Sequence, residues 1–418
     1  MSDARSARMS GAGRPPYAAW LPLLLGFLQA VGPMSIDMYL PAFPNIEAEF
    51  HAAPGAAQLT LATWILGLSF GQLLTGALAD RFGRRLPLLC GTAVYTFASI
   101  GCATAPSIGW LAVWRFMAAI GGSASMIVPR AVVRDISEGH EAARLMSRLI
   151  LILGVAPILA PSLGGLVLQM ASWRGIFWIT AAYGLIGLLL SAWLLPDTLE
   201  PVRRVHLRLA NMLARYGQIL RERGFLTHTL MLASASFALF AYLGGSPTTF
   251  IGTYHLTPGR FAIVFGAVAA TYVLFSQGNV YATRRLGLDL TLRVASSLYL
   301  VLAALLLGLT LSGRGNVLSM AVVLALTQGL TGFISPTATV GALAHHAAHA
   351  GSASAVMGTL QFLIGCSSGF LIAWLTNGTP VPMAGLMAAG ACSMKLADLC
   401  RPRRPGPSAL HPIAPRPP

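Results

Sequence analysis

Two ionisable side chains, Asp37 and Arg115, lie inside long apolar stretches of the sequence. If these stretches cross a bilayer, each charge costs about 3 kcal/mol near its centre, so such residues face a cavity or a partner. At 1.5 Å per residue, both lie roughly 12 Å below the outer ends of their stretches. They can form an ion pair that locks two helices, or share a water-filled cavity. In a cavity, a change in their separation alters the proton affinity of Asp37, which is what coupling to a proton gradient requires.

Other residues are candidates for the wall of such a cavity. Gln29 lies two helical turns before Asp37 on the same face, where it lines the cavity or makes a packing hydrogen bond. Candidates for cargo contacts elsewhere are Gln361 and the aromatic residues Tyr39, Tyr242, Phe333 and Trp374. Each aromatic residue has the alternative of packing against lipid or a neighbouring helix.

The composition requires that most of the chain is removed from water. Of the 418 residues, 55% are hydrophobic and 10% are charged, whereas a soluble protein carries about 25% charged residues. The net charge of +15 can indicate nucleic-acid binding. The arginines, however, lie between apolar stretches, which favours a role in membrane topology, and we expect no nucleic-acid partner. The first apolar stretch lacks a clear cleavage site, so we expect no cleavable signal peptide.

Neither cysteines nor histidines predict a metal site. The cysteines (Cys90, Cys102, Cys366, Cys392 and Cys400) have no CxxC spacing and mostly fall in apolar stretches, as small buried side chains do. His345, His346 and His349 share one loop, which either binds a metal or is a solvated polar loop. We expect the second, and we expect no cofactor because a proton gradient would drive the protein.

The apolar stretches predict an all-α membrane protein. A bilayer core requires about 20 apolar residues per helix, and continuous rather than alternating stretches argue against strands. The twelve expected spans are residues 17–41, 54–79, 86–105, 108–130, 144–169, 174–195, 225–250, 258–283, 290–312, 315–340, 351–376 and 380–399.

The distribution of basic residues predicts that both termini are cytoplasmic. Cytoplasmic loops are enriched in lysine and arginine. One side holds the basic head, the links after spans 2, 4 and 8, the central linker and the tail. The loops on the opposite side contain only Arg174, Arg260 and Arg314.

The spans form two six-helix halves, residues 1–200 and 225–400. Residues 201–224 form a cytoplasmic linker, either an amphipathic helix on the membrane surface or a plain connector. Residues 401–418 form a Pro/Arg-rich cytoplasmic tail that we expect to be disordered. The triplet Arg-Phe-Gly at 81–83, after span 2, has a weak counterpart, Arg-Leu-Gly at 285–287, after span 8. Related halves with a midplane site between them are typical of rocking transporters.

A short basic link, Gly-Ala-Leu-Ala-Asp-Arg-Phe-Gly-Arg-Arg at 76–85, joins spans 2 and 3. It resembles the signature between helices 2 and 3 of the major facilitator superfamily, a family of transporters. The glycines allow a tight link and close helix approach, and Asp80 can accept from backbone amides at the start of the next helix. The resemblance implies that the link acts as a gate latch, and the alternative is that it only anchors the membrane topology. In either case we expect no contact with the cargo. The latch residues are Gly76, Asp80, Arg81, Gly83, Arg84, Arg85 and, at the end of span 4, Asp135.

Further motifs follow in order along nearly the whole chain. They lie at 37–44, 114–116 with 121–122, 130–135, 154–165, 173–178, 195–199, 246–247 and 351–355. Their sequences resemble the drug:proton antiporters of the Bcr/CflA group, which are related to bicyclomycin and chloramphenicol/florfenicol resistance. In one departure, Ala118-Ala119 replaces the usual Gln-Gly and removes a polar neighbour of Arg115.

Span 5 contains glycines and prolines that resemble the antiporter motif of this group: Gly154, Pro157, Pro161, Gly164 and Gly165. Small residues let helices approach closely, and prolines kink them. The resemblance implies that the motif bends the helix and seals the site against leak. Ordinary tight helix packing is compatible with that role.

These features predict a bacterial inner-membrane transporter rather than an enzyme. The leading expectation is export of small, partly apolar drugs or toxic metabolites in exchange for protons, by a monomer. Proton-coupled uptake of a small metabolite is the alternative, against which the span 5 motif argues. A membrane sensor or enzyme is a third possibility. The sequence has no HExxH, nucleophile elbow, phosphate loop, intramembrane acid pair or appended soluble domain to support it.

Overall fold

The computed structural model describes residues 20–137, 139–199, 216–344, 346 and 350–402. Every regular element in these residues is helical, which confirms the all-α prediction. The helices are α2 (Leu21–Gln29), α3 (Val31–Asp37), α4 (Phe43–Glu49), α5 (Ala56–Phe82), α6 (Arg85–Ala103), α7 (Ile108–Ile136), α8 (Gly139–Met170), α9 (Arg174–Leu194), α11 (Arg223–Pro247), α12 (Pro258–Leu311), α13 (Val317–Leu343), α14 (Ala350–Leu375) and α15 (Val381–Leu399). Most of the linker 201–224, two of the three loop histidines (His345 and His349) and most of the tail lie outside the described residues.

The first predicted span is not the single helix expected over 17–41. α2 and α3 are separated at Ala30, and a 3-10 turn, η1 (Leu40–Ala42), separates α3 from α4. Three prolines (Pro33, Pro41 and Pro44) lie in or next to these breaks. Because proline lacks a backbone donor and clashes with the preceding turn, it interrupts a helix. The breaks make Asp37 the last residue of α3.

α12 is 54 residues long, or about 80 Å, which is more than twice the thickness of a bilayer core. Inside it, Gly287 has φ 78° and ψ 165°, so two helices meet at this residue. Gly83, between α5 and α6, has φ 91° and ψ 174°. This backbone region is essentially restricted to glycine. The weak repeat at 81–83 and 285–287 therefore corresponds to the same turn.

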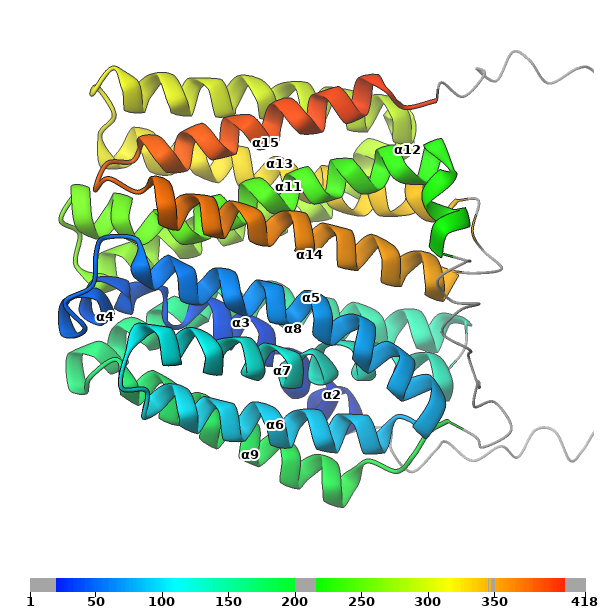
Figure 1. Ribbon diagram of the computed structural model, residues 1–418. Coiled ribbons are helices and arrows are strands. Elements are labelled where there is room, and N and C mark those ends of the chain that lie inside the picture. Colours follow the sequence, from blue (N-terminus) through cyan, green and yellow to red (C-terminus); the bar gives the residue numbers. More distant parts are fainter. Residues whose placement is uncertain (1–19, 138, 200–215, 345, 347–349, 403–418) are drawn as a thin grey trace, which may run out of the picture.

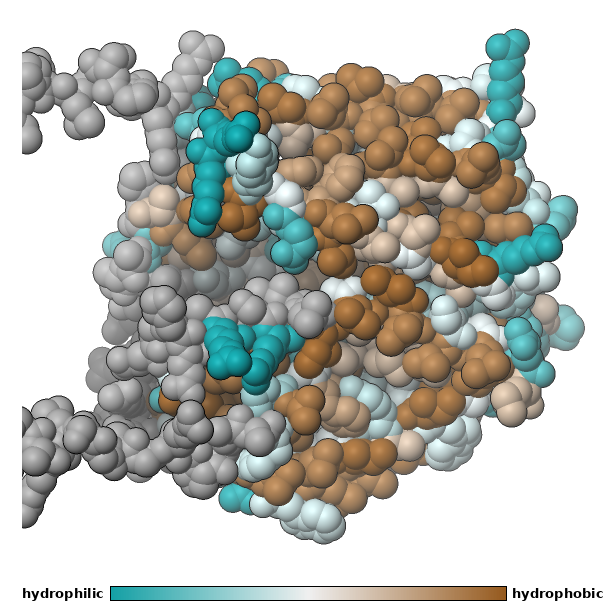
Figure 2. All heavy atoms as spheres, turned by 180° about the vertical axis from the view of Figure 1, so that it is seen from behind, coloured by the Kyte–Doolittle hydropathy of each residue, from teal (hydrophilic) through white to brown (hydrophobic). Residues whose placement is uncertain are grey.

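The surface is suited to lipid. Nine helical segments in the described residues are long and apolar enough to cross a membrane, and α8 adds a shorter apolar segment, Gly154–Met170. Figure 2 shows a broad band of hydrophobic side chains across the middle of one face, with hydrophilic residues gathered at its two ends. Large side chains in contact with the surroundings include Trp374, which is 82% exposed.

The helices form two groups that lie side by side, α2–α9 and α11–α15, here called the N-terminal and C-terminal groups (Figure 1). They contact each other chiefly through α5 with α14 and α8 with α12. The α5–α6 turn, the start of α11 and the end of α15 lie at the same end of the molecule (Figure 1). We call this the basic end.

At the end of the molecule opposite the basic end, the two groups of helices are in contact. Near the start of α5, the side chains of Gln58 and Thr248 hydrogen bond across the two groups at 2.8 Å. Further along, Ser69 Oγ donates to the carbonyl oxygen of Thr359 at 3.3 Å. A Cβ at Gly358 in α14 would lie 3.0 Å from Gln72 Oε1, whereas a Cβ at Gly76, one turn further along α5, would meet no atom of the described residues within 4 Å. The interface therefore ends before the α5–α6 turn.

Candidate functional site

A cavity of about 380 Å³ lies between the two groups of helices. Helices α3, α5, α7 and α8 form one wall, and α11, α12, α13 and α14 form the other. The lining is mostly apolar, and its polar members are Asp37, Ser236, Tyr242, Tyr272, Gln328, Thr331, Ser335 and Gln361. A cavity of this size and character is suited to a small, largely apolar molecule.

Asp37 supplies a carboxylate to this cavity. Its side chain is buried, at 5% exposure, and it has no ion-pair or hydrogen-bond partner among the described residues. Burying an uncompensated charge is costly. A proton, or a cationic or hydrogen-donating group of a bound molecule, would therefore stabilise this side chain.

Arg115 is held by aromatic rings rather than by Asp37. Its guanidinium carbon lies 4.2 Å from the ring centroid of Tyr39, 4.4 Å from that of Trp64 and 5.8 Å from that of Phe177. Desolvated cation–π contacts contribute about 2 kcal/mol. Arg115 forms no ion pair with Asp37 within the described part of the chain and does not line the cavity, although its Nε and Nη2 lack hydrogen-bond partners there.

A further charged side chain, Arg130, lies inside α7. The helix continues to Ile136, beyond the predicted end of span 4 at residue 130, so Arg130 lies inside the helix rather than at its end. With its amide oriented for hydrogen bonding, the Gln29 oxygen accepts from Arg130 Nε at 2.6 Å and Nη2 at 3.2 Å. Gln29 is fully buried and makes this contact instead of lining the cavity.

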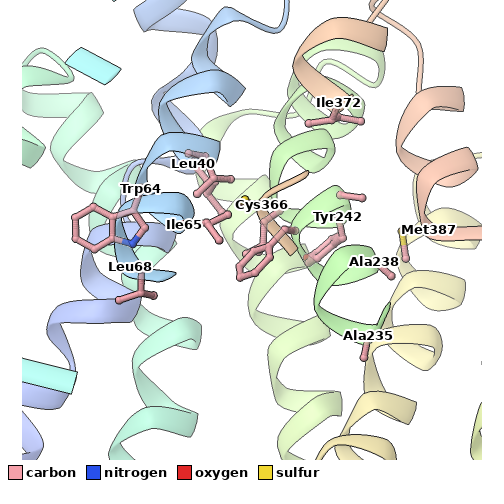
Figure 3. Packing of buried hydrophobic residues seen from close by; sticks show 14 of the residues in the cluster. Leu40, Trp64, Ile65, Leu68, Ala235, Ala238, Tyr242, Cys366, Ile372 and Met387 are labelled. Carbon is pink, nitrogen blue, oxygen red and sulfur yellow. The ribbon is translucent and has the colours of Figure 1, made fainter. Parts of the chain in front are cut away.

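The other cavity candidates divide into two sets. Tyr242 and Gln361 line the cavity, and Gln361 Nε2 donates to Ser236 Oγ at 2.8 Å. Tyr39, Phe333 and Trp374 do not line it. In Figure 3, Leu40 and Ile65 lie between Trp64 on one side and Tyr242 on the other, within a core that is continuous across both groups of helices.

Gln328 is a cavity residue that the sequence analysis missed. It lines the cavity from α13 and is 2% exposed. The signal was available, because a polar side chain in the middle of an apolar stretch is the same pattern that selected Asp37 and Gln29.

Arg84 is the centre of a charge cluster at the α5–α6 turn. Its Nη1 donates to Asp80 Oδ1 at 2.6 Å, and its Nε donates to Asp135 Oδ2 at 2.7 Å. Its backbone amide donates to Asp197 Oδ1 at 2.8 Å. Asp197, rather than Asp80 as predicted, therefore accepts from the start of α6. Burial lowers the pKa of the Arg84 guanidinium, but the hydrogen bonds and charges of Asp135 and Asp80 outweigh burial and hold that pKa above its ordinary value.

The remaining latch candidates make different contacts. A Cβ at Gly83 would overlap the Asp197 carboxylate and displace it from the Arg84 amide, in addition to the cost of the backbone angles. Arg81 lies over the ring of Phe82, at 5.1 Å from its centroid, and Arg85 Nη2 donates to a carbonyl oxygen of α9 at 2.6 Å. Gly76 makes no close helix approach, which corrects that prediction, because the interface between the two groups ends before it.

The first part of the antiporter-like motif lies beside the cavity. Gly154 and Pro157 line it, and Pro157 and Pro161 lie inside α8. A Cβ at Gly154 would lie 3.2 Å from Val273 in α12. The small residue therefore brings the two groups of helices close together at the cavity wall.

The two glycines at the end of this motif differ. A Cβ at Gly164 would overlap the carbonyl oxygen of Met38, the residue after Asp37. A Cβ at Gly165 would make ordinary contact with Pro258, at 3.5 Å. Gly164 thus sets how closely α8 approaches the break in the first span.

A second charge cluster lies at the same end as the Arg84 cluster, in the C-terminal group. Asp398 accepts from Lys395 Nζ at 2.8 Å, from Arg401 Nη2 at 2.6 Å and from Ser296 Oγ at 3.1 Å. Arg401 Nη1 also donates to Asp289 Oδ1 at 2.8 Å. The cluster ties the end of α15 to the turn at Gly287. In the loop before α14, His346 pairs with Glu222.

Two groups of apolar helices, with a mostly apolar cavity between them and charge clusters at one end, define a membrane transporter of small molecules. A profile described as Major Facilitator Superfamily matches residues 25–372. The chain belongs to the major facilitator superfamily. It is a multi-pass transporter of the inner membrane and not an enzyme.

Relatives include drug-resistance proteins, which confirms the resemblance to the Bcr/CflA group. An "Uncharacterized MFS-type transporter YdgK" of Bacillus subtilis is 32% identical over 90% of this chain and 94% of its own length. A "Bicyclomycin resistance protein homolog" of Haemophilus influenzae is 30% identical over 88% of this chain and 92% of its own. A "Chloramphenicol resistance protein" of Pseudomonas aeruginosa is 30% identical over 76% and 72%, respectively.

Solved structures of transporters share the fold. A mutant form of the nucleoside transporter NupG superposes with a TM-score of 0.72 at 11% identity, covering 91% of this chain and 98% of its own. A D-xylose-proton symporter has a TM-score of 0.70 at 15% identity, with coverages of 91% and 95%. At these identities the similarity concerns the fold alone.

Proposed function

We propose that the protein exports small, partly apolar drugs or toxic metabolites in exchange for protons, by alternating access. The observation that carries this proposal is the buried Asp37 carboxylate at the cavity, without a compensating cation among the described residues. Such a carboxylate is stabilised by a proton or by a bound cargo group, but the two compete for it. That competition is the basis of exchange.

The proposal includes a complete membrane arrangement. The pieces of the first span count as one crossing and the two parts of α12 as two, which gives twelve crossings, with both termini in the cytoplasm. Residues 1–200 and 225–400 form the two halves, joined by the linker 201–224. Arg401, the first residue of the predicted tail, hydrogen-bonds Asp398 and Asp289, which corrects the expectation of disorder at this position. The protein acts as a monomer, with protons and cargo as its partners, and needs no cofactor, metal or nucleic acid.

The basic end is the cytoplasmic end in this arrangement. The interface is closed near Gln58 and ends before Gly76, so we assign this conformation to the inward-open state. The Arg84 cluster acts as a latch that keeps the α5–α6 turn rigid while the two groups rock. Arg115 packs against Tyr39, which follows Asp37 by two residues in the first span. A movement of Arg115 therefore shifts Asp37 and changes the proton affinity of its carboxylate.

The names of the relatives favour drugs as cargo, since two refer to resistance to bicyclomycin or chloramphenicol. The glycines and prolines of α8 favour exchange over uptake by their resemblance to the antiporter motif. One measurement distinguishes export from uptake by proton symport: the direction in which a proton gradient moves the cargo.

The test uses the purified full-length protein in vesicles loaded with labelled chloramphenicol. Acidifying the outside should drive chloramphenicol out of the vesicles as protons enter, and an uncoupler should abolish the effect. Inward accumulation of chloramphenicol would establish symport instead. Flux that does not respond to the gradient would remove proton coupling from the proposal.

A further inference from the structure

The side-chain amide of Gln328 is buried without partners. Gln328 lines the cavity and is 2% exposed, and neither Nε2 nor Oε1 has a hydrogen-bond partner in the described part of the chain. Buried polar groups are nearly always paired, and leaving one unpaired costs about 1–3 kcal/mol. Packing alone does not account for an amide where a leucine would fill the same space without that cost.

The nearby polar groups of the described residues do not hydrogen-bond the Gln328 amide. Thr331 lies one turn further along α13, and its Oγ1 donates to the backbone oxygen of Gln328 at 2.5 Å. On α14, the Gln361 amide is engaged with Ser236. The cavity therefore contains two amides of the same type, one with a protein partner and one without.

Asp37 lies in the opposite wall of the same cavity and is also without a partner among the described residues. The acid comes from the N-terminal group and the amide from the C-terminal group. A molecule that contacts both would connect the two groups of helices, and neither group offers both contacts alone.

We propose that Gln328 is a specificity-determining residue that hydrogen-bonds an amide of the cargo. An amide offers a donor and an acceptor, as Gln328 does, so cargo N–H can donate to Oε1 while Nε2 donates to the cargo carbonyl. The glutamine breaks no side-chain hydrogen bond when it turns toward the cargo. Sites that hydrogen-bond a substrate reject analogues lacking the group more strongly than apolar pockets do. This inference rests on the proposed function, because it assigns the cargo of the same cavity.

The test measures equilibrium binding to the purified full-length protein in detergent, without a membrane or a proton gradient. The probes are labelled chloramphenicol, a secondary amide, and its N-methylated derivative, which keeps the carbonyl but lacks the N–H. The wild-type protein should bind chloramphenicol about tenfold more tightly than the derivative. Gln328→Leu should remove this preference by weakening chloramphenicol binding about tenfold more than binding of the derivative, which loses only the bond from Nε2 to its carbonyl.

Two controls separate recognition from a structural role. Because Gln328→Leu removes an unpaired buried amide, its melting temperature should equal or exceed that of the wild type. A structural amide predicts the opposite. Gln361→Leu removes an amide of equal size from the same cavity, and it should retain the preference for the N–H form because that amide is engaged with Ser236.

Equal affinity of the wild-type protein for both probes, or absence of binding to either, would overturn the inference. So would a preference that survives in Gln328→Leu, or a parallel loss for both probes. The proposed function fails separately. A protein that binds with the amide preference but does not couple flux to protons contradicts exchange alone, and proton-driven export without the preference contradicts the role of Gln328 alone.

Discussion

Two buried carboxylates, Asp37 and Asp398, each 5% exposed, have opposite surroundings. Asp398 accepts hydrogen bonds from Lys395, Arg401 and Ser296, whereas Asp37 has no partner among the described residues. The charge of Asp398 is compensated within the fold, so that residue stabilises one structure. The charge of Asp37 is not compensated, so its stability depends on what enters the cavity. Burial alone therefore does not distinguish the two acids, whereas the presence or absence of a compensating cation among the described residues does.

The comparison extends to the surroundings of the two acids. Asp398 is one residue from the end of α15 and belongs to a network that includes the turn at Gly287. Asp37 ends the short helix α3 in a first span broken into pieces, and α8 packs closely against it through Gly164. The compensated acid belongs to a hydrogen-bonded network, and the uncompensated acid lies at a break between helical segments.

Asp37→Asn should have the largest effect on transport. The amide preserves the shape of the side chain but cannot exchange a proton, so proton-driven export of chloramphenicol should be lost. Resistance in an efflux-deficient bacterial host should be lost with it. The melting temperature should not fall, because an uncompensated buried charge is removed. Asp398→Asn at matched expression is the control, and unchanged export by Asp37→Asn would exclude Asp37 from coupling.

Asp398→Asn should act on stability instead. It leaves Lys395 and Arg401 without their shared carboxylate, which should lower the free energy of unfolding in detergent by about 3 kcal/mol. Arg401→Gln should lower the free energy of unfolding less in the Asp398→Asn background than in the wild type, because the two residues share one network. Additive losses of unfolding free energy would show that the network does not act as a unit. If folded Asp398→Asn lost proton-driven export, the contrast with Asp37 would be wrong.

Gly164→Ala should slow export because the added methyl group overlaps the Met38 carbonyl oxygen and displaces the segment that ends in Asp37. Small misplacements at a site reduce rates strongly, so we expect about a tenfold lower export rate in vesicles at normal protein abundance. Gly165→Ala is the matched control, since its Cβ has room beside Pro258 at 3.5 Å. Equal losses in both variants would mean that the motif acts through general packing.

The two glycine turns offer the smallest expected effect. An added Cβ at Gly287 meets no atom of the described chain within 4 Å, so the cost of Gly287→Ala comes from the backbone angles, about 1–2 kcal/mol of unfolding free energy. Gly83→Ala carries the same backbone cost and also overlaps Asp197, so it should be less stable than Gly287→Ala. Denaturant unfolding of both variants measures the difference, and equal values would indicate that the Asp197 contact contributes nothing.

Much of the fold could be predicted from the sequence because it is encoded locally. Long apolar stretches predict the helices, and a weak repeat relates the segments that end at Gly83 and Gly287, which the structure shows to have the same backbone conformation. The breaks in the first span were also encoded locally, in Pro33, Pro41 and Pro44. Hydropathy does not reveal these breaks, because it takes no account of the backbone donors that proline lacks.

The site could be predicted only in part, because it depends on contacts between distant segments. Asp37 was found from its type and position alone. The surroundings of Arg115 come from three separate segments of the chain and cannot be found from spacing. Gln328 carried a detectable signal, but the absence of a partner, which distinguishes it from Gln361, exists only in three dimensions.

The contact between Trp64 and Arg115 provides an intrinsic fluorescent probe of the Arg115 charge. The guanidinium carbon lies 4.4 Å from the indole centroid, and the indole Nε1 has no hydrogen-bond partner among the described residues. Indole emission responds to the field of a nearby charge. A variant in which Trp64 is the single fluorophore would therefore report, without any attached dye, each movement of that charge during a transport cycle.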